Sequence, residues 1–228
     1  MDSMYERLMG LPLFKGASTE LIHSFAEKTP LRFTTYKPGE TIVRERDNCS
    51  TVKCVVSGSV VCEHHLFNGA MTVREFLDAG VVLAVEHLFG LDTRYGICVK
   101  ANSQCGIMEF SKKQYMQLLQ THNLVLLNYL NYLARRAQNC EHALSSHTMK
   151  NISSELSFLV QVSSNVDGHD IDIETSGTPI IEVLSGGERA EDRDFEELIK
   201  NGFIEILSDY KIKIPSRKLL LDYFSNEE

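Results

Sequence analysis

The chain has 228 residues, of which 43% are hydrophobic, and its formal net charge is −8. This length suits one large domain or two small ones, and the composition excludes global disorder. No apolar run reaches the roughly 18 residues that a membrane-spanning helix needs. The N-terminus, MDSMYERLMG, lacks the basic and apolar segments of a signal peptide. We therefore expect a cytoplasmic protein with no membrane partner.

The six cysteines contain no CxxC pair, which argues against a zinc or iron–sulfur site. In a cytoplasmic chain they should be reduced and mostly buried. Residue type alone makes haem-ligand candidates of His64, His65, Met71 and His87. His64 and His65 are adjacent on a predicted strand, so they should point to opposite faces. Motifs of common enzymes are absent, and the sequence predicts no metal, no cofactor and no catalysis.

The first half of the chain is predicted to be rich in short β-strands. A helix should span Thr19–Lys28, with Ser18 as its N-cap. Alternating or β-branched segments predict strands at LRFTTY, ETIVRE, TVKCVVSGSVVCEH, MTVREFL, YGICVKA and QCGIMEF. Turns are expected at residues 37–39, 57–58 and 68–69, and a short helix at 82–90. This succession favours a barrel or jelly roll.

After Ser111 the hydrophobic period becomes helical. Ser111 and Gln114 have the spacing of a capping box, and the segment KKQYMQLLQ leads into a longer helix. Heptad-like spacing relates Leu119, Leu126, Leu130, Leu133, Ala137, Cys140 and Leu144. Such a seam is typical of a helix that pairs with a copy of itself, which predicts a homodimer. The alternative is one amphipathic helix that packs on its own domain.

The last third combines helices with a hairpin. A helix is expected at Met149–Val162, then a strand, DIDIE, and a helix at Pro179–Leu184 with Thr178 as N-cap. After the turn SGG, a second helix should run over Glu188–Lys200 and stop at Gly202, before the strands FIEIL and YKIKI. The predicted core positions are Ile181, Leu184, Phe195, Leu198 and Ile199. Helix, turn, helix and hairpin predict a winged helix-turn-helix.

This order of parts resembles the Crp/Fnr family of bacterial transcription regulators. The segment IIEVLSGGERAEDRDFEELIKNGFI, residues 180–204, is similar without a gap to the family's helix-turn-helix. LPLFKGASTELIHSFAEK, KPGETIVRE, VVSGSV, FLDAG and FSKKQYMQLLQ look like its opening helix, barrel turns and connector. The resemblance implies an α+β fold: a cyclic-nucleotide-binding-type β-barrel (jelly roll) over 1–117, a dimerisation helix over 118–147 and a winged helix-turn-helix over 148–228.

The resemblance also implies double-stranded DNA and RNA polymerase as partners. By position or charge, the candidate DNA-contacting residues are Thr178, Ser185, Glu188, Arg189, Asp192, Arg193, Lys211 and Lys213. Arg189 and Arg193 are four residues apart and should share one helix face. However, residues 188–200 carry six acidic and three basic side chains, and phosphate repels carboxylates. The alternative is a ligand-binding or protein-interaction module with a vestigial winged helix.

Members of the family that bind cyclic AMP contact its ribose through a Gly-Glu pair and its phosphate through an arginine. Counted from Gly80, these positions fall on Val85 and Tyr95, while Glu86 is one residue late and Arg94 one residue early. A phosphate needs a fixed cationic donor, so we expect that cyclic AMP does not bind. A small bulge would restore the register. These five residues are the candidate effector pocket, for an unidentified small molecule or for none.

Overall fold

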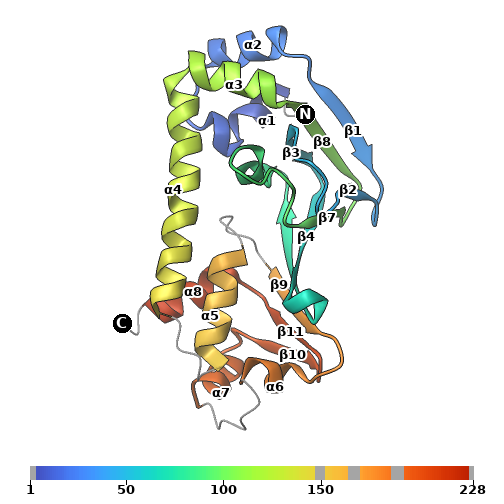
Figure 1. The fold of residues 1–228 in the computed structure, drawn as a ribbon, viewed down its shortest axis with the longest axis vertical. Coiled ribbons are helices and arrows are strands. Elements are labelled where there is room, and N and C mark those ends of the chain that lie inside the picture. Colours follow the sequence, from blue (N-terminus) through green and yellow to red (C-terminus); the bar gives the residue numbers. More distant parts are fainter. Residues whose placement is uncertain (1–3, 147–151, 164–169, 186–192, 226–228) are drawn as a thin grey trace. The chain divides into compact units, whose positions relative to one another are not determined.

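The structure, a computed structural model, describes residues 4–146, 152–163, 170–185 and 193–225 (Figure 1). The chain divides into two compact units that are discontinuous in sequence. Unit 1 comprises residues 1–62 and 77–134, and unit 2 comprises residues 63–76 and 135–228. Among the described helices, none is long and apolar enough to cross a membrane.

Unit 1 contains the β-rich first half of the chain. Its helical elements are α1 (Met4–Met9), η1 (Pro12–Phe14), α2 (Thr19–Lys28), η3 (Val85–Leu88) and α3 (Lys112–Thr121). Its strands are β1 (Arg32–Tyr36), β2 (Thr41–Val43), β3 (Thr51–Ser57), β6 (Val81–Leu83), β7 (Cys98–Ala101) and β8 (Cys105–Ser111). One sheet has the order β1-β8-β3-β6, and β2 pairs with β7. This jelly-roll-like arrangement agrees with the predicted barrel.

Local signals define several element boundaries in unit 1 as predicted. The Ser18 side chain accepts a hydrogen bond from the Leu21 amide and caps α2. Ser111 and Gln114 form the predicted capping box at the start of α3. Gly58, between β3 and the next strand, has a φ of +73°, and a Cβ atom there would lie 2.3 Å from the Gln104 carbonyl oxygen. Only glycine fits this turn.

Helix α4 (Asn123–Ser146) contributes its first half to unit 1 and its second half to unit 2. It begins later than the sequence analysis expected, because α3 ends at Thr121 and His122 is extended, with a φ of −132°. Leu119 therefore lies in α3, and the predicted continuous spacing from Leu119 into the long helix is wrong. The remaining seam residues all lie on α4.

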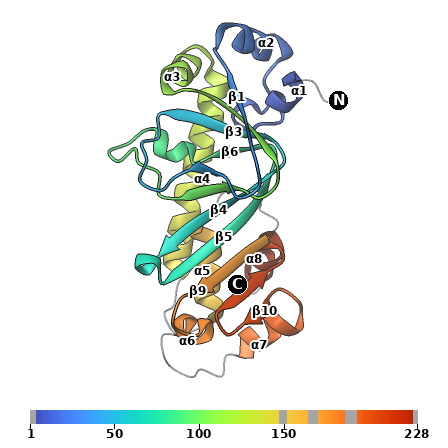
Figure 2. The ribbon, with the colours of Figure 1, turned by 90° about the vertical axis from the view of Figure 1, so that its right-hand side faces the viewer.

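Among the described residues, unit 2 contains a five-strand portion of sheet, the 3-10 helix η2 (Phe67–Gly69), and four α-helices besides its half of α4. The strands follow the order β10-β11-β9-β5-β4, of which Figure 2 labels β10, β9, β5 and β4. They are β4 (Ser59–Leu66) and β5 (Met71–Asp78), whose residues 63–76 belong to this unit, and β9 (Asp170–Thr175), β10 (Glu205–Ser208) and β11 (Lys211–Ile214). The helices are α5 (Ile152–Ser163), α6 (Ile180–Leu184), α7 (Arg193–Lys200) and α8 (Arg217–Ser225).

The core of unit 2 gathers residues from β5, β9, β11 and helices α5, α6, α7 and α8, and Leu66 of β4 packs against it, whereas all four residues of β10 are exposed. The predicted residues Leu184, Phe195 and Leu198 are buried in it, and Ile181 and Ile199 pack against it, which confirms this set. Gly202, with a φ of +74°, ends α7 as expected. The Phe203 and Gly202 amides donate to the carbonyls of Leu198 and Ile199, as in a Schellman motif.

Two features of this region differ from what the sequence predicts. The N-cap of α6 is Pro179, without a side-chain cap, so the prediction of Thr178 as N-cap is wrong. The Thr178 carbonyl instead accepts a hydrogen bond from Thr175 Oγ1 at 2.7 Å, which closes the turn after β9. Helix α8, by contrast, was not expected from the sequence. The expected helices Met149–Val162 and Glu188–Lys200 were predicted to begin within residues 147–151 and 186–192, which lie outside the described residues.

Candidate effector and nucleic-acid sites

The candidate effector residues lie on one stretch of unit 1, from the turn before β6 to the residues before β7. Gly80 has a φ of +100°, and its amide donates to the Val55 carbonyl at 2.8 Å. After β6 the chain turns at Ala84, which has a left-handed φ of +48°, and enters η3. Val85, at the position of the family's ribose-binding glutamate, is 1% exposed. This position therefore contributes an apolar side chain to the core.

Tyr95, at the position of the family's arginine, is also part of the core, with 5% of its surface exposed. Its amide donates to the Asp47 carbonyl, and its carbonyl accepts from the Arg46 amide. Burial and a hydrogen bond with the Cys49 side chain raise the pKa of Tyr95 well above its ordinary range. The ring is thus held neutral and inside unit 1. Tyr95 cannot supply the positive charge that a cyclic phosphate needs.

Arg94 and Glu86, the polar residues one position out of register, already have partners within unit 1. Arg94 donates to both carboxylate oxygens of Asp92, from Nε at 2.9 Å and from Nη2 at 2.7 Å. These hydrogen bonds keep the pKa of Asp92 below its ordinary range. Glu86 Oε2 accepts from the Tyr132 hydroxyl of α4 at 3.1 Å. The five candidates therefore share one segment, but Val85 and Tyr95 point into the core and Arg94 lies on the surface.

Three of the six predicted seam residues on helix α4 are exposed, and the other three are half-buried. Val125 and Tyr129 are its buried side chains in unit 1, with 0% and 5% exposure. Among the seam residues, Leu130 and Leu144 are 49% and 68% exposed. Ala137 is also exposed, while Leu126, Leu133 and Cys140 are half-buried. One face of α4 thus packs on its own chain, and a second, largely apolar face remains partly exposed.

The candidate DNA-contacting residues are described only in part. Glu188, Arg189 and Asp192 lie outside the described residues, and Arg193 begins α7 with an undescribed side chain. Ser185 follows α6, and its hydroxyl donates to the Glu182 carbonyl at 3.2 Å. These residues stay predictions.

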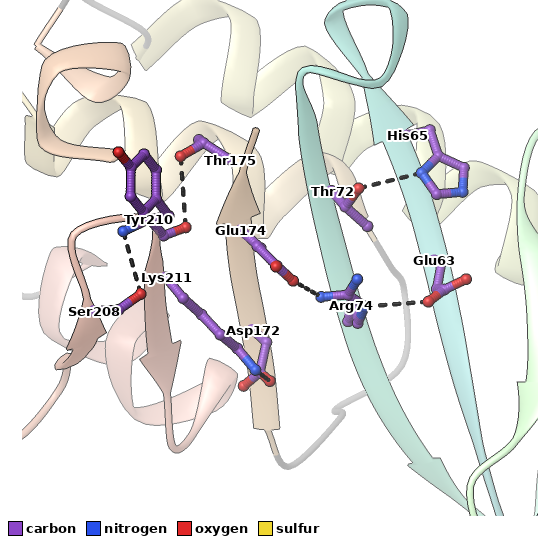
Figure 3. Close-up of polar contacts among 10 residues, drawn as sticks. All are labelled: Glu63, His65, Thr72, Arg74, Asp172, Glu174, Thr175, Ser208, Tyr210 and Lys211. Atoms are coloured by element: carbon purple, nitrogen blue, oxygen red, sulfur yellow. Dashed lines mark hydrogen bonds and ion pairs between the residues drawn. The ribbon is translucent and has the colours of Figure 1, made fainter. Parts of the chain in front are cut away.

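The two candidate lysines of β11 form ion pairs with acidic residues of the neighbouring strand β9. Lys211 Nζ lies 2.7 Å from Asp172 Oδ2 (Figure 3). Lys213 Nζ lies 2.8 Å from Asp170 Oδ2. Each ammonium group thus already has a carboxylate partner at ion-pair distance. A phosphate would have to compete with Asp170 and Asp172 for them.

The polar face of the unit 2 sheet extends to β4 and β5, which the sequence analysis did not foresee. Arg74 on β5 donates to Glu63 Oε1 on β4 at 3.1 Å and also to Glu174 on β9. Figure 3 shows these residues side by side with Lys211 and Asp172. The one available signal was the polar alternation of MTVREFL and DIDIE. That alternation fixes which side chains share a face but does not identify the partner strand.

The histidines and cysteines that were considered as metal or haem ligands lie in several different environments. His64 Nε2 lies 3.2 Å from the buried Glu75 carboxyl, whereas His65 hydrogen-bonds to Thr72 on the polar face, so the two point to opposite faces as expected. All six cysteines are free, and most are buried. In the part of the chain that the structure describes, no three His, Cys, Asp or Glu side chains are grouped to hold a metal.

Comparison with known proteins is consistent with this architecture. Residues 33–122 match the family model of the cyclic nucleotide-binding domain. The chain is 28% identical over 111 residues to the cAMP-activated global transcriptional regulator CRP of Haemophilus influenzae, a match covering 49% of this chain and 50% of the relative. The corresponding CRP of Pasteurella multocida is 27% identical over 111 residues, 49% of this chain and 53% of the relative. The matches thus span about half the length of these curated relatives.

Among solved structures, the catabolite activator protein of Thermus thermophilus aligns with 95% of this chain and 100% of its own. Its TM-score is 0.55 at 16% sequence identity, so this likeness concerns the fold alone. The chain therefore has an α+β fold of the catabolite activator type, with a jelly-roll-like N-terminal part.

Proposed function

We propose that this chain, whose residues 33–122 match the family model of the cyclic nucleotide-binding domain, is a homodimeric, DNA-binding transcription regulator of the Crp/Fnr type. It would act in the bacterial cytoplasm, without enzymatic activity and with RNA polymerase as a further partner. The observation that carries the proposal is the order of elements after a domain homologous to CRP. The long helix α4 leads to α5, β9, α6, α7 and the β10–β11 hairpin.

In this proposal α7 is the recognition helix and β10–β11 is the wing. Residues Arg189 and Arg193 would face the major groove, with Ser185, Glu188 and Asp192 near the base edges. Thr178, Lys211 and Lys213 are the candidate phosphate contacts. The exposed leucines of α4 would pair with the same face of a second copy, as a heptad seam does. A dimer would then present two recognition helices to adjacent major grooves.

We further propose that the barrel does not respond to cyclic AMP. Val85 and Tyr95 are buried among the protein's own side chains, and Arg94 is engaged by Asp92. Titration calorimetry of the full chain with cyclic AMP should therefore give no binding heat. Saturable binding would overturn this part of the proposal and leave the DNA-binding part untouched.

The DNA-binding part is tested by selecting binding sites from random duplex DNA at low salt. We expect a near-palindrome with half-sites roughly 34–36 Å apart. Leu130→Asp should convert the dimer to a monomer in analytical ultracentrifugation and abolish enrichment, because it places a carboxylate in the seam. Leu91→Asp, at a fully exposed leucine outside α4, is the matched control and should leave both unchanged. If the dimer forms but no sequence is enriched, DNA reading is contradicted.

That last outcome would favour a second candidate, an interaction module with a vestigial winged helix. The acidic composition of residues 188–200 and the ion pairs of Lys211 and Lys213 favour it. Arg193→Ala separates the two candidates at one residue. It should weaken DNA binding at least tenfold if Arg193 makes a bidentate base contact, and change nothing in an interaction module.

A further inference from the structure

The β4–β5 hairpin comes from the middle of the barrel sequence, yet residues 63–76 belong to unit 2. Every residue from Met71 to Phe76 pairs with β9, antiparallel, from Met71↔Thr175 to Phe76↔Asp170. Figure 3 shows β5 beside β9 on its polar face. The chain thus crosses between the units at residues 62/63 and 76/77 as well as at 134/135 within α4. Two of these crossings flank the hairpin.

One face of the docked hairpin is part of the unit 2 core. Met71 and Val73 on β5 are each 1% exposed, and Ile171 and Ile173 on β9 are each 0% exposed. Burial of such side chains stabilises the docked state by roughly 1.5–3 kcal/mol each. Without the hairpin, the unit 2 core would lack Met71 and Val73, and β9 would lose the strand that pairs with it from Met71 to Phe76.

On the opposite, polar face of the hairpin, Arg74 links β5 to β9 through a hydrogen bond. Its guanidinium donates to Glu63 on its own hairpin and to Glu174 on β9, so it bridges the hairpin and the acceptor strand (Figure 3). The Arg74 side chain is 27% exposed, and that of Glu63 is 9% exposed. Charge-assisted hydrogen bonds of this kind are stronger than neutral ones.

Glu75, next to Arg74 but on the core face, works against docking. It is 0% exposed, and neither carboxyl oxygen accepts a hydrogen bond from the described residues. His64 Nε2, on the same hairpin, lies 3.2 Å from Oε1, within ion-pair distance, but the two groups form no hydrogen bond. The residue opposite Glu75 on β9 is the apolar Ile171. A buried carboxyl group without hydrogen bonds is costly, and opening the hairpin would return Glu75 to water.

We propose that the β4–β5 hairpin is a detachable clasp that completes the unit 2 sheet by strand addition to β9. Arg74 fastens the clasp, and the buried Glu75 keeps the docked state weak enough to open without unfolding of the rest of unit 2. Because barrel residues flank the hairpin on both sides, the clasp gives the barrel a second covalent route to unit 2 besides α4. The inference goes beyond the proposed function and holds whether or not the chain binds DNA.

The antiparallel ladders of β9 make opening measurable at single amides. The Thr175 amide donates to Tyr210 beside β11, and the Ser176 amide donates to Ala70 beside β5. Amides alternate in direction along a strand, so those of Asp172 and Glu174 face β5 and those of Ile171 and Ile173 face β11. Opening of the clasp should expose the first pair only.

The test is residue-resolved amide hydrogen exchange on the full chain. In the unmodified protein, Asp172 and Glu174 should exchange faster than Ile171 and Ile173. Arg74→Met should accelerate Asp172 and Glu174 by about tenfold or more, because bonds to charged groups are lost. Arg32→Met, which removes an ion pair with Glu109 in unit 1, is the matched control and should not affect β9.

Glu75→Leu provides the opposite perturbation on the same strand. It should slow exchange at Asp172 and Glu174 by about tenfold, because an apolar side chain replaces a buried carboxyl group of similar size. This measurement stands even where Arg74→Met unfolds unit 2. The inference is overturned if the four β9 amides always change together, or if Glu75→Leu leaves exchange unchanged or accelerates it.

Discussion

Unit 1 and unit 2 both enclose apolar cores, but they bury different polar groups. Every buried charged residue among the described ones lies in unit 2, where Glu63, Glu75 and Asp172, taken as whole residues, are at most 7% exposed and Arg217 is 2% exposed. Unit 1 instead buries tyrosines, with Tyr95, Tyr115 and Tyr129 at most 5% exposed. We conclude that the core of unit 1 is stabilised by close packing and neutral aromatic rings, whereas the core of unit 2 also depends on interactions between charged side chains.

The largest effect should come from changing shape in unit 1. Gly58→Ala forces a Cβ atom to within 2.3 Å of the Gln104 carbonyl oxygen and 2.8 Å of Cys105 Cα. Backbone must move to relieve this contact, so we expect a loss of about 3 kcal/mol or more in the free energy of unfolding of unit 1. Chemical denaturation followed separately in the two units measures it.

Gly177→Ala, in unit 2, is the matched control. Gly177 has a φ of +87°, but a Cβ atom added there would meet no heavy atom of the described residues within 4 Å. The substitution should therefore cost only the strain of a left-handed alanine, about 1 kcal/mol. Equal losses for the two variants would contradict the view that the Gly58 turn depends on close approach.

An intermediate effect should appear at high pH, again in unit 1. Burial raises the pKa of Tyr129 to about 12, above the ordinary value of about 10. Between these values the unfolded chain loses this proton and the folded chain keeps it. The free energy of unfolding should thus be unaffected by Tyr129 below about pH 10 and fall by about 1 kcal/mol per pH unit above it.

Denaturation of unit 1 from about pH 9 to 11.5 tests this window. Tyr129→Phe should make the decline shallower, at the cost of the 3.5 Å contact between the hydroxyl and the Val85 carbonyl. Tyr210→Phe, at an exposed tyrosine of unit 2, should leave the slope unchanged. A decline of the same steepness in Tyr129→Phe would remove Tyr129 as its source.

The smallest effect concerns charge in unit 2. Lys211→Met leaves Asp172, whose side chain is 10% exposed, without its ammonium partner, and should cost about 1 kcal/mol. Lys213→Met removes a pair with Asp170, whose side chain is 37% exposed, and should cost about 0.5 kcal/mol or less. Thermal denaturation of the two variants compares them, and the reverse order would mean that burial does not set the strength of these pairs.

The sequence predicted those parts of the fold that local chemistry determines. Ser18, the Ser111–Gln114 capping box and Gly202 act through neighbouring backbone groups, and each has its expected role. The pairing of β5 with β9 could not be predicted, because Arg74 and Glu174 are 100 residues apart. Each strand alternates in polarity as a strand on many sheets would, so the choice of partner depends on the whole fold.

In the candidate sites, too, features that depend on local sequence were predicted and features that depend on strand pairing were not. Register alone placed Val85 and Tyr95 where a cyclic-AMP site needs Glu and Arg, and their apolar and aromatic character matches their burial. The ion pairs of Lys211 and Lys213 were not predicted, because they depend on which strand lies beside β11. The misplaced cap at Thr178 differs by one residue, the usual error at a helix end.

The discontinuous chain order of unit 2 has a consequence for recombination. A crossover between two related genes after the codon for residue 134 would transfer residues 135–228 without residues 63–76. The incoming β9 would then pair with a hairpin that had evolved beside a different strand. Arg74 would face different carboxylate side chains. A functional exchange of unit 2 therefore requires that residues 63–76 and 135–228 be transferred together. We expect substitutions in the hairpin and in β9 to be correlated among related sequences.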